Sequence, residues 1–284
     1  MTTNVMTGDP RTDLGKWSGF WLGVASLVIA AVIWLPLVHF FFQPDPGQYR
    51  SATEIPVRGI KLAQRHLSNW QTADQRKADA TLLRASNPEW DLMSRGYVVL
   101  SLANMSLRDS AKRETYLGCI DRIIDDTLAA ERANGHFHFL LPYARARSFE
   151  VTPVRSFHVD SQIGLMLAAR CMLQKDDDEL QMLRERVEIM QSRMEASPVL
   201  AAESYPNECW MFDIVNGLAV MRMCDVVTGT DHSAFRDKWL AVARAKLVDP
   251  QNRNACIELQ CFRSAQGWTG GLVDLDGCSC ASAC

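Results

Sequence analysis

The stretch SFHVDSQIGLMLAARCMLQKDDDELQMLRERVEIMQSRMEAS, residues 156–197, contains the pattern that decides the fold. Its first part, 156–175, is apolar around most of a helical circumference and rich in small residues, whereas 179–197 carries charges on either side of an apolar stripe. A helix that is apolar all round is buried, and a striped helix faces water on one side. With its break at 176–178, the stretch therefore predicts an αα-hairpin of one inner and one outer helix.

The same layout recurs before and after this hairpin. Residues 88–107 and 111–135 repeat the order of an apolar helix and a striped one, and residues 207–227 and 234–250 repeat it again. A shorter helical pattern at 52–70 precedes all three units. Hairpins that recur about every 50 residues are typical of helical repeat and toroid architectures. We predict a mainly α fold of repeated αα-hairpins, with an irregular helical bundle as the alternative that the low identity between units leaves open.

An apolar segment precedes the helical domain. From Trp17 to Phe42 the chain contains no Asp, Glu, Lys or Arg. At about 1.5 Å per helical residue this segment spans roughly 39 Å, more than the roughly 30 Å of a bilayer's hydrocarbon core. We predict a single-pass membrane anchor at 17–42. A cleaved signal peptide and a buried core helix are the alternatives, although the apolar run exceeds a usual signal and no small-residue cleavage site follows it.

The charges that flank this segment leave the side of the membrane open. Arg11 and Lys16 precede it, and four basic residues follow it, Arg50, Arg58, Lys61 and Arg65. The positive-inside rule therefore does not favour a cytoplasmic N-terminus. The predicted organisation is an N-terminal tail at 1–16, the anchor at 17–42, a linker at 43–50, a helical domain at 51–276 and a cysteine-rich tail at 277–284.

Composition excludes several classes of function. The chain has 284 residues with 48% hydrophobic and 22% charged residues, an ordinary globular balance, and its net charge of −3 offers no basic surface for nucleic acid. The phosphate-binding loop, the G-x-S-x-G elbow and the H-E-x-x-H motif do not occur. The nine cysteines include no C-x-x-C pair. Cys119, Cys171 and Cys224 fall in apolar helical stretches and are predicted to pack there, while the role of Cys278, Cys280 and Cys284 is left open.

Candidate catalytic residues lie where the third hairpin begins. Glu208, Cys209 and Asp213 fall in the first turns of its inner helix, close enough to share one end of a cavity. Two carboxyls held close in a poorly solvated pocket repel each other, which raises the pKa of one and creates an acid/base pair. Helix capping is the alternative role for Glu208. Asp213 lies deeper in an apolar helix, where capping explains it less well.

The second hairpin begins with another polar pair, His158 and Asp160, which we predict to act as a proton relay at the same mouth. An Asp N-cap beside an exposed His is the alternative. The aromatic residues Tyr205, Trp210 and Tyr143 are predicted to line the site with Cys209. His136 and His138 could bind a metal together with His158 or Asp160, but they have no metal-site spacing, and we predict neither a metal nor a cofactor.

Residues 203–250 resemble the linalool dehydratase/isomerase family. The resemblance rests on Pro206 in an E-x-x-P-N setting, Trp210, the apolar inner helix, and three later elements, Gly229-Thr230-Asp231, Trp239 and Asp249-Pro250. It implies an (α/α)6 barrel with its cavity at the starts of the inner helices. It also implies cofactor-free loss or addition of water on a small apolar alcohol.

The sequence departs from that family at the residues that carry its chemistry. In register with the family, the two active-site cysteines fall at Ser204 and Asp213, and the histidine of the preceding helix falls near Gln162. We therefore expect Asp213 and Glu208 to exchange protons, His158 and Asp160 to relay them, and Gln162 to contact the substrate.

Six hairpins of about 50 residues need more chain than residues 51–284 supply, so we expect either a truncated form of the toroid or an open layer that another subunit completes. The predicted protein is a membrane-anchored lyase or isomerase that acts on a terpenoid-like alcohol. A non-catalytic binding or scaffold protein and a glycan-processing α/α toroid are the alternatives.

Overall fold

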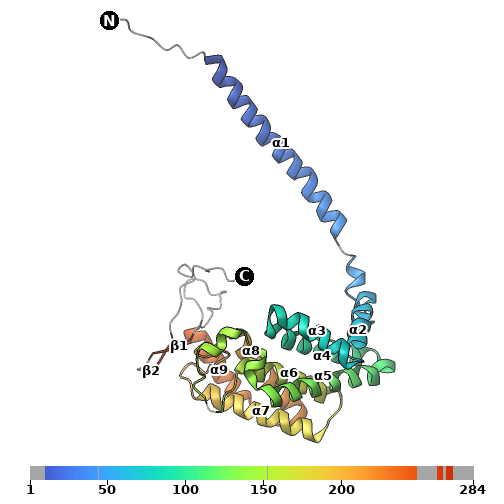
Figure 1. Cartoon of the computed structure of the whole chain (residues 1–284), viewed down its shortest axis with the longest axis vertical. Helices are drawn as coiled ribbons and strands as arrows, with labels where there is room; N and C mark the ends of the chain where they lie inside the picture. Colours follow the sequence, from blue (N-terminus) through green and yellow to red (C-terminus); the bar gives the residue numbers. More distant parts are fainter. Residues whose placement is uncertain (1–9, 44, 152, 248–260, 265–266, 271–284) are drawn as a thin grey trace. The chain divides into compact units, whose positions relative to one another are not determined.

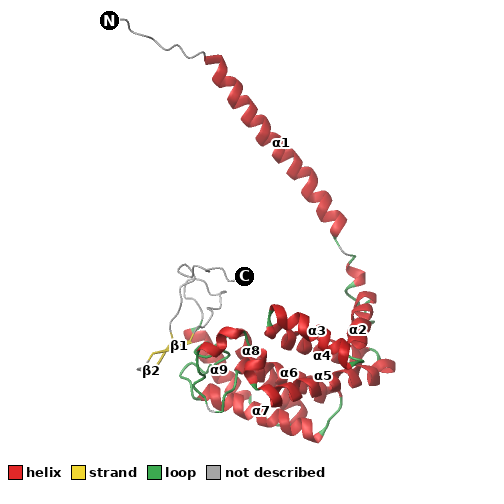
Figure 2. Ribbon diagram, viewed as in Figure 1, coloured by secondary structure: helices red, strands yellow, loops and turns green. Residues whose placement is uncertain are grey.

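The computed structural model describes residues 10–43, 45–151, 153–247, 261–264 and 267–270, shown as ribbons in Figures 1 and 2. The chain divides into two compact units, Met1–Ser51 and Ala52–Cys284.

The first unit contains one long apolar helix. Helix α1 runs from Pro10 to Phe42, so it begins before the predicted start at Trp17. It is the one helix in the described part of the chain that is long and apolar enough to cross a membrane, and none of the apolar window is buried. That exposure argues against the alternative of a buried core helix. A signal sequence would share these properties. A short 3-10 turn, η1, follows at Pro46–Gln48 and is capped by Asp45.

The second unit is mainly helical, as the sequence predicts. Its α-helices are α2 (Val57–Asn69), α3 (Ala73–Ser86), α4 (Pro88–Arg108), α5 (Arg113–Asn134), α6 (Phe157–Leu173), α7 (Asp177–Glu195), α8 (Met211–Thr228) and α9 (Ser233–Lys246). Three 3-10 turns join them, η2 (Ser110–Lys112), η3 (His136–Phe139) and η4 (Pro142–Ala146). Two short antiparallel strands that the sequence did not predict, β1 (Cys261–Ser264) and β2 (Gly267–Gly270), pair Cys261 with Gly270.

Local signals place the helix ends where the pattern predicts them. The Asn87 side chain accepts a hydrogen bond from the Glu89 amide at the start of α4, Ser156 caps α6, and Asp176 caps α7. These side chains satisfy amide groups that a helix leaves unpaired in its first turn. Helix α8 ends at Thr228 and is capped by Gly229, whose φ of 77° lies in the left-handed region that favours glycine.

Helices α4 to α7 follow the order of inner and outer helices that the hydrophobic pattern predicts. Helix α6 packs against both α4 and α8, while α5 and α7 pack on the outside of this row (Figure 1). Nearly every residue of α6 is buried. Helix α7 buries a single stripe, Leu180, Leu183, Val187, Met190 and Met194. The row α4–α6–α8 therefore brings together the N-terminal turns of three successive inner helices.

Glycines allow α6 and α8 to approach closely. A Cβ added to Gly164 would lie 2.9 Å from the Val220 side chain, and one added to Gly217 would lie 2.6 Å from the Phe157 ring. Because Phe157 is fully buried, its ring has little room to move away. This contact sets the spacing between the two helices that carry the candidate site.

Gly217→Ala is expected to lower the free energy of unfolding by about 1–3 kcal/mol, the usual cost of overpacking a core. Gly118→Ala is the matched control, because its added Cβ would meet only the Arg122 side chain at 3.7 Å. In the middle of α5 that change should instead stabilise by roughly 0.5–1 kcal/mol. Urea unfolding of both variants measures the two values, and equal effects would contradict the packing described here.

Candidate functional site

The candidate site is built from the first turns of the three inner helices. Glu89 is in the first turn of α4, His158 is in the first turn of α6, and Asp213 is in the first turn of α8. All three side chains are buried.

The segment before α8 is tied to the start of α6. The Phe157 amide donates to the Glu203 carbonyl at 2.8 Å, and the Ser156 hydroxyl donates to the Ser204 carbonyl at 2.6 Å. These bonds hold the two helix starts side by side.

The structure pairs His158 with Asp213. His158 Nδ1 lies 2.9 Å from Asp213 Oδ1, and the two side chains are 1% and 0% exposed. An ionised carboxylate only accepts hydrogen bonds, so Nδ1 carries the hydrogen and donates a hydrogen bond to Asp213. Within the described part of the chain, the other atom of each group, His158 Nε2 and Asp213 Oδ2, has no hydrogen-bond partner. A buried polar atom without a partner is costly, and such atoms are common where a ligand completes the bonding.

The surroundings favour the protonated imidazole. Burial by itself lowers the pKa of His158, but the hydrogen bond and charge of Asp213 and the charge of Glu89 outweigh it, so the pKa lies above its ordinary value of 6.5. A histidine whose pKa is raised keeps its proton to a higher pH than a free histidine does.

Three aromatic rings form a stack that ends at the His158 ring. The ring of Tyr205 is stacked between Tyr143, at 5.1 Å, and Trp210, at 4.9 Å between centroids. Trp210 in turn lies 6.5 Å from the His158 ring. Tyr205 is fully buried, whereas Tyr143 is 48% exposed. The stack therefore runs from the protein surface to the imidazole.

Glu208 lies on the edge of this stack and not beside Asp213. The Tyr143 hydroxyl and the Trp210 ring N–H each donate to Glu208 Oε2 at 3.1 Å. The two carboxyls thus have different hydrogen-bond partners, and no bond joins Glu208 to Asp213 among the described residues. The reason is local: Asp213 lies inside the helix and turns to α6, while Glu208 precedes it in the loop.

Two polar residues of the site were missed in the sequence. The Tyr205 hydroxyl donates to Glu89 and accepts a bond from the Leu141 amide at 2.9 Å, so Glu89 fixes the middle ring of the stack. Asn216 follows Asp213 by one helical turn, and its buried Nδ2 has no hydrogen-bond partner in the described part. Glu89 could have been found from its position, because it lies in the first turn of its inner helix, as His158 does in the next inner helix.

Asp160 belongs to a different cluster, so the predicted His158–Asp160 relay is wrong. Asp160 Oδ2 accepts from Arg155 Nε at 3.0 Å, and Asp160 also pairs with Arg186 and, at 3.7 Å, with Arg193. Although it is only two positions from His158, Asp160 points to the α7 side, where Arg186 and Arg193 lie. Its carboxylate is bound by guanidinium groups and is not available as a proton carrier.

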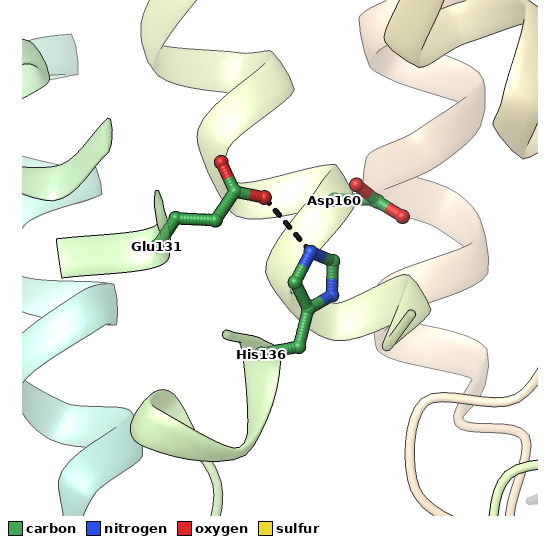
Figure 3. Close-up of side chains that lie close together, drawn as sticks. All are labelled: Glu131, His136 and Asp160. Atoms are coloured by element: carbon green, nitrogen blue, oxygen red, sulfur yellow. Dashed lines mark hydrogen bonds and ion pairs between the residues drawn. The ribbon is translucent and has the colours of Figure 1, made fainter. Parts of the chain in front are cut away.

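Glu131, His136 and Asp160 approach one another within this cluster (Figure 3). One possible ligand atom from each of the three side chains lies within 4.8 Å of the other two, an arrangement that resembles a metal site. However, Arg186 donates to Glu131 Oε2 at 2.8 Å and also pairs with Asp160, so a positive charge already lies between the carboxylates. Both ring nitrogens of His136 also have partners. Nε2 lies 2.8 Å from Glu131, and Nδ1 accepts a hydrogen bond from the Ser156 amide at 2.7 Å. We interpret this Arg186 cluster as an ion-pair network.

The remaining predicted residues have separate surroundings. Gln162 is buried one turn after His158, and its Oε1 lies against Gly96 of α4. Cys209 is buried in the core. His138 is not near His136's partners and contacts Arg84 instead, at 3.3 Å. Cys119, Cys171 and Cys224 are buried free thiols, as predicted.

The Arg186 cluster should make stability depend on acid pH. Burial alone would raise the pKa of Glu131, but the bond from His136 and the charge of Arg186 lower it to about 2. A depressed carboxyl pKa stabilises the fold at pH values above the ordinary 4.5, and this contribution is lost as the pH falls towards 2. We expect Glu131→Gln to flatten the fall in unfolding free energy between about pH 5 and pH 2, measured by urea denaturation at each pH. An unchanged slope would contradict the assignment.

Asp249-Pro250 and the cysteines at 278, 280 and 284 lie outside the described residues. No protein-family model matches this sequence, and no characterised protein is significantly similar to it.

Proposed function

We propose that this chain is an acid/base enzyme, a hydro-lyase or isomerase, in which the His158–Asp213 pair moves the proton. The observation that carries the proposal is the free, buried Nε2 of an imidazole whose Nδ1–H is held by a buried carboxylate. A base oriented in this way by a third group is the arrangement that general acid/base catalysis requires.

The aromatic stack supports a small apolar alcohol as substrate. In dehydration, protonated His158 donates the Nε2 proton to the hydroxyl, the C–O bond breaks, and water leaves. The carboxylate of Glu208 then takes a proton from the neighbouring carbon, and the C–H electron pair forms the double bond. The proton returns from Glu208 to His158 through water, which closes the cycle. The positive charge that develops on carbon is attracted by the faces of aromatic rings such as Trp210.

The remaining residues would position these groups. Asp213 holds the imidazole in one tautomer, and Glu89 holds Tyr205 in the stack. The row of inner helices is compatible with an open α/α toroid of the linalool dehydratase/isomerase type, which we propose as the wider architecture. The apolar helix α1 would anchor the enzyme in a membrane, into which substrates of this class partition.

The competing function is non-catalytic binding of an apolar molecule. It is favoured by the burial of His158 and Asp213, at 1% and 0% exposure, because a substrate reaches Nε2 only if Trp210 or its neighbours move.

The test is an assay of the purified full chain with a panel of small terpene alcohols. Alkene or isomer release is followed by gas chromatography, and thermal stability is followed by circular dichroism. Product formation supports the enzyme. A melting temperature raised by an alcohol that is returned unchanged supports binding alone, and no product and no shift with any alcohol overturns the substrate class.

A further inference from the structure

A second surface of the helical unit has the properties of a ligand site. Between α2 and α4 lies a groove of about 390 Å³. Its lining is largely apolar and includes Ile55, Pro56, Leu62, Ala63, Val98 and Met105. A volume of this size takes one chain of a lipid or a molecule of similar size. None of its lining residues belongs to the His158–Asp213 site.

Large apolar side chains around this groove are exposed. Leu62 of α2 and Tyr97 of α4 line the groove and are each 54% exposed, and Val57 at the start of α2 is 62% exposed. Surface apolar residues that gather beside a groove, rather than lying singly, mark a binding surface.

Basic residues border the same surface. Arg58, Lys61 and Arg65 are spaced three and four positions apart on α2, so they lie on one side of the helix, and all three are exposed. Helix α2 contains no acidic residue. A helix with exposed apolar residues and a row of positive charges is typical of helices that lie on a membrane surface.

The position of α2 in the chain also favours a membrane surface as its partner. Only residues 43–56 separate the end of the apolar helix α1 from the start of α2. A fully extended segment of this length reaches at most about 50 Å. If α1 is inserted in a bilayer, the lipid headgroups are therefore always present at high local concentration near α2.

We propose that α2 and the α2–α4 groove bind the surface of a bilayer that contains anionic lipids. Arg58, Lys61 and Arg65 pair with the headgroup phosphates and carboxylates, while Val57 and Leu62 enter the boundary between headgroups and acyl chains. The groove accepts one acyl chain. Each basic residue near an anionic surface favours the bound state by about fivefold, so the three together contribute about 100-fold.

The proposal also gives the side of the membrane. In cells the anionic surface is that of the cytoplasmic leaflet. Contact of Arg58, Lys61 and Arg65 with this leaflet would put the helical unit on the cytoplasmic side, which the flanking charges alone leave open.

The test uses the full chain reconstituted in nanodiscs, either of phosphatidylcholine alone or with about 30% phosphatidylserine. Hydrogen exchange of the peptide covering 57–69 is measured by mass spectrometry. We expect exchange about tenfold slower with phosphatidylserine, and we expect the difference to disappear in about 0.5 M NaCl, which screens the charges. The salt comparison needs no variant, so it does not depend on how any substitution folds.

Two triple variants complete the test. Arg58→Gln, Lys61→Gln, Arg65→Gln should lose the slowing, whereas Lys238→Gln, Arg244→Gln, Lys246→Gln on α9, which removes the same charge, should keep it. Equal exchange in both lipids, or slowing that survives in the α2 variant, overturns the proposal. Equal slowing in neutral nanodiscs with a poly-glutamate peptide would also overturn it, because the partner would then be an acidic peptide.

Discussion

Replacing His158 by asparagine is expected to lower kcat/KM for the dehydration of an accepted alcohol by about 10²- to 10⁴-fold, the usual contribution of a positioned acid/base group. The asparagine amide can take the place of Nδ1 and still donate to Asp213, so the hydrogen bond at 2.9 Å in the wild type is retained. What is lost is Nε2, the ring nitrogen of His158 that has no hydrogen-bond partner among the described residues. Steady-state kinetics of product release measures the effect.

The chain offers a matched control for this variant. His232 pairs with Asp225 through the same kind of contact, but between the end of α8 and the start of α9, far along α8 from Asp213. His232→Asn should therefore leave kcat/KM within about twofold of wild type. A loss in both variants would indicate a general effect on folding, and a loss in neither would remove His158 from the mechanism.

A titration of the imidazole separates catalysis from structure. In Asp213→Asn the burial of His158 remains while the neighbouring charge is lost, so the pKa of His158 should fall from above 6.5 to below it. Nuclear magnetic resonance of the histidine ring reports this value without any substrate.

The helical layout was predictable because the pattern of buried residues in each helix follows from its local sequence. The apolar 156–175 and the striped 179–197 correspond to α6 and α7, since a side chain's neighbours in a hairpin follow from helical spacing. Helix α3 was not predicted, because it has no buried residue and hence no apolar stripe that would mark it as a helix.

The site was predictable only in part, because its contacts cross between hairpins. His158 and Asp213 could be chosen singly as polar residues in apolar helix starts, but their pairing joins positions 55 residues apart. Asp160 could not be assigned correctly, because in the sequence its partner Arg186 looks like a surface charge of the outer helix. Only the folded structure shows that the Arg186 side chain points inward to Asp160.

Asp160→Asn is expected to be the most destabilising single polar change, at about 3–5 kcal/mol, the cost of breaking a buried ion pair. The carboxylate is fully buried and balances Arg186, which is itself 8% exposed, as well as Arg155 and Arg193. The amide is neutral, so Arg155 and Arg193 lose the negative charge of Asp160, and Arg186 keeps only Glu131.

Asp126→Asn provides the comparison at a solvent-exposed pair. Asp126 lies 2.7 Å from Arg95 but is 41% exposed, and Arg95 keeps a second carboxylate, Asp91, at 2.8 Å. Its loss should cost no more than about 1 kcal/mol. Urea denaturation at neutral pH measures both variants. If Asp160→Asn instead unfolds like wild type but no longer turns over substrate, Asp160 acts in catalysis as the sequence first indicated, and the Arg186 cluster is not what stabilises this end of α6.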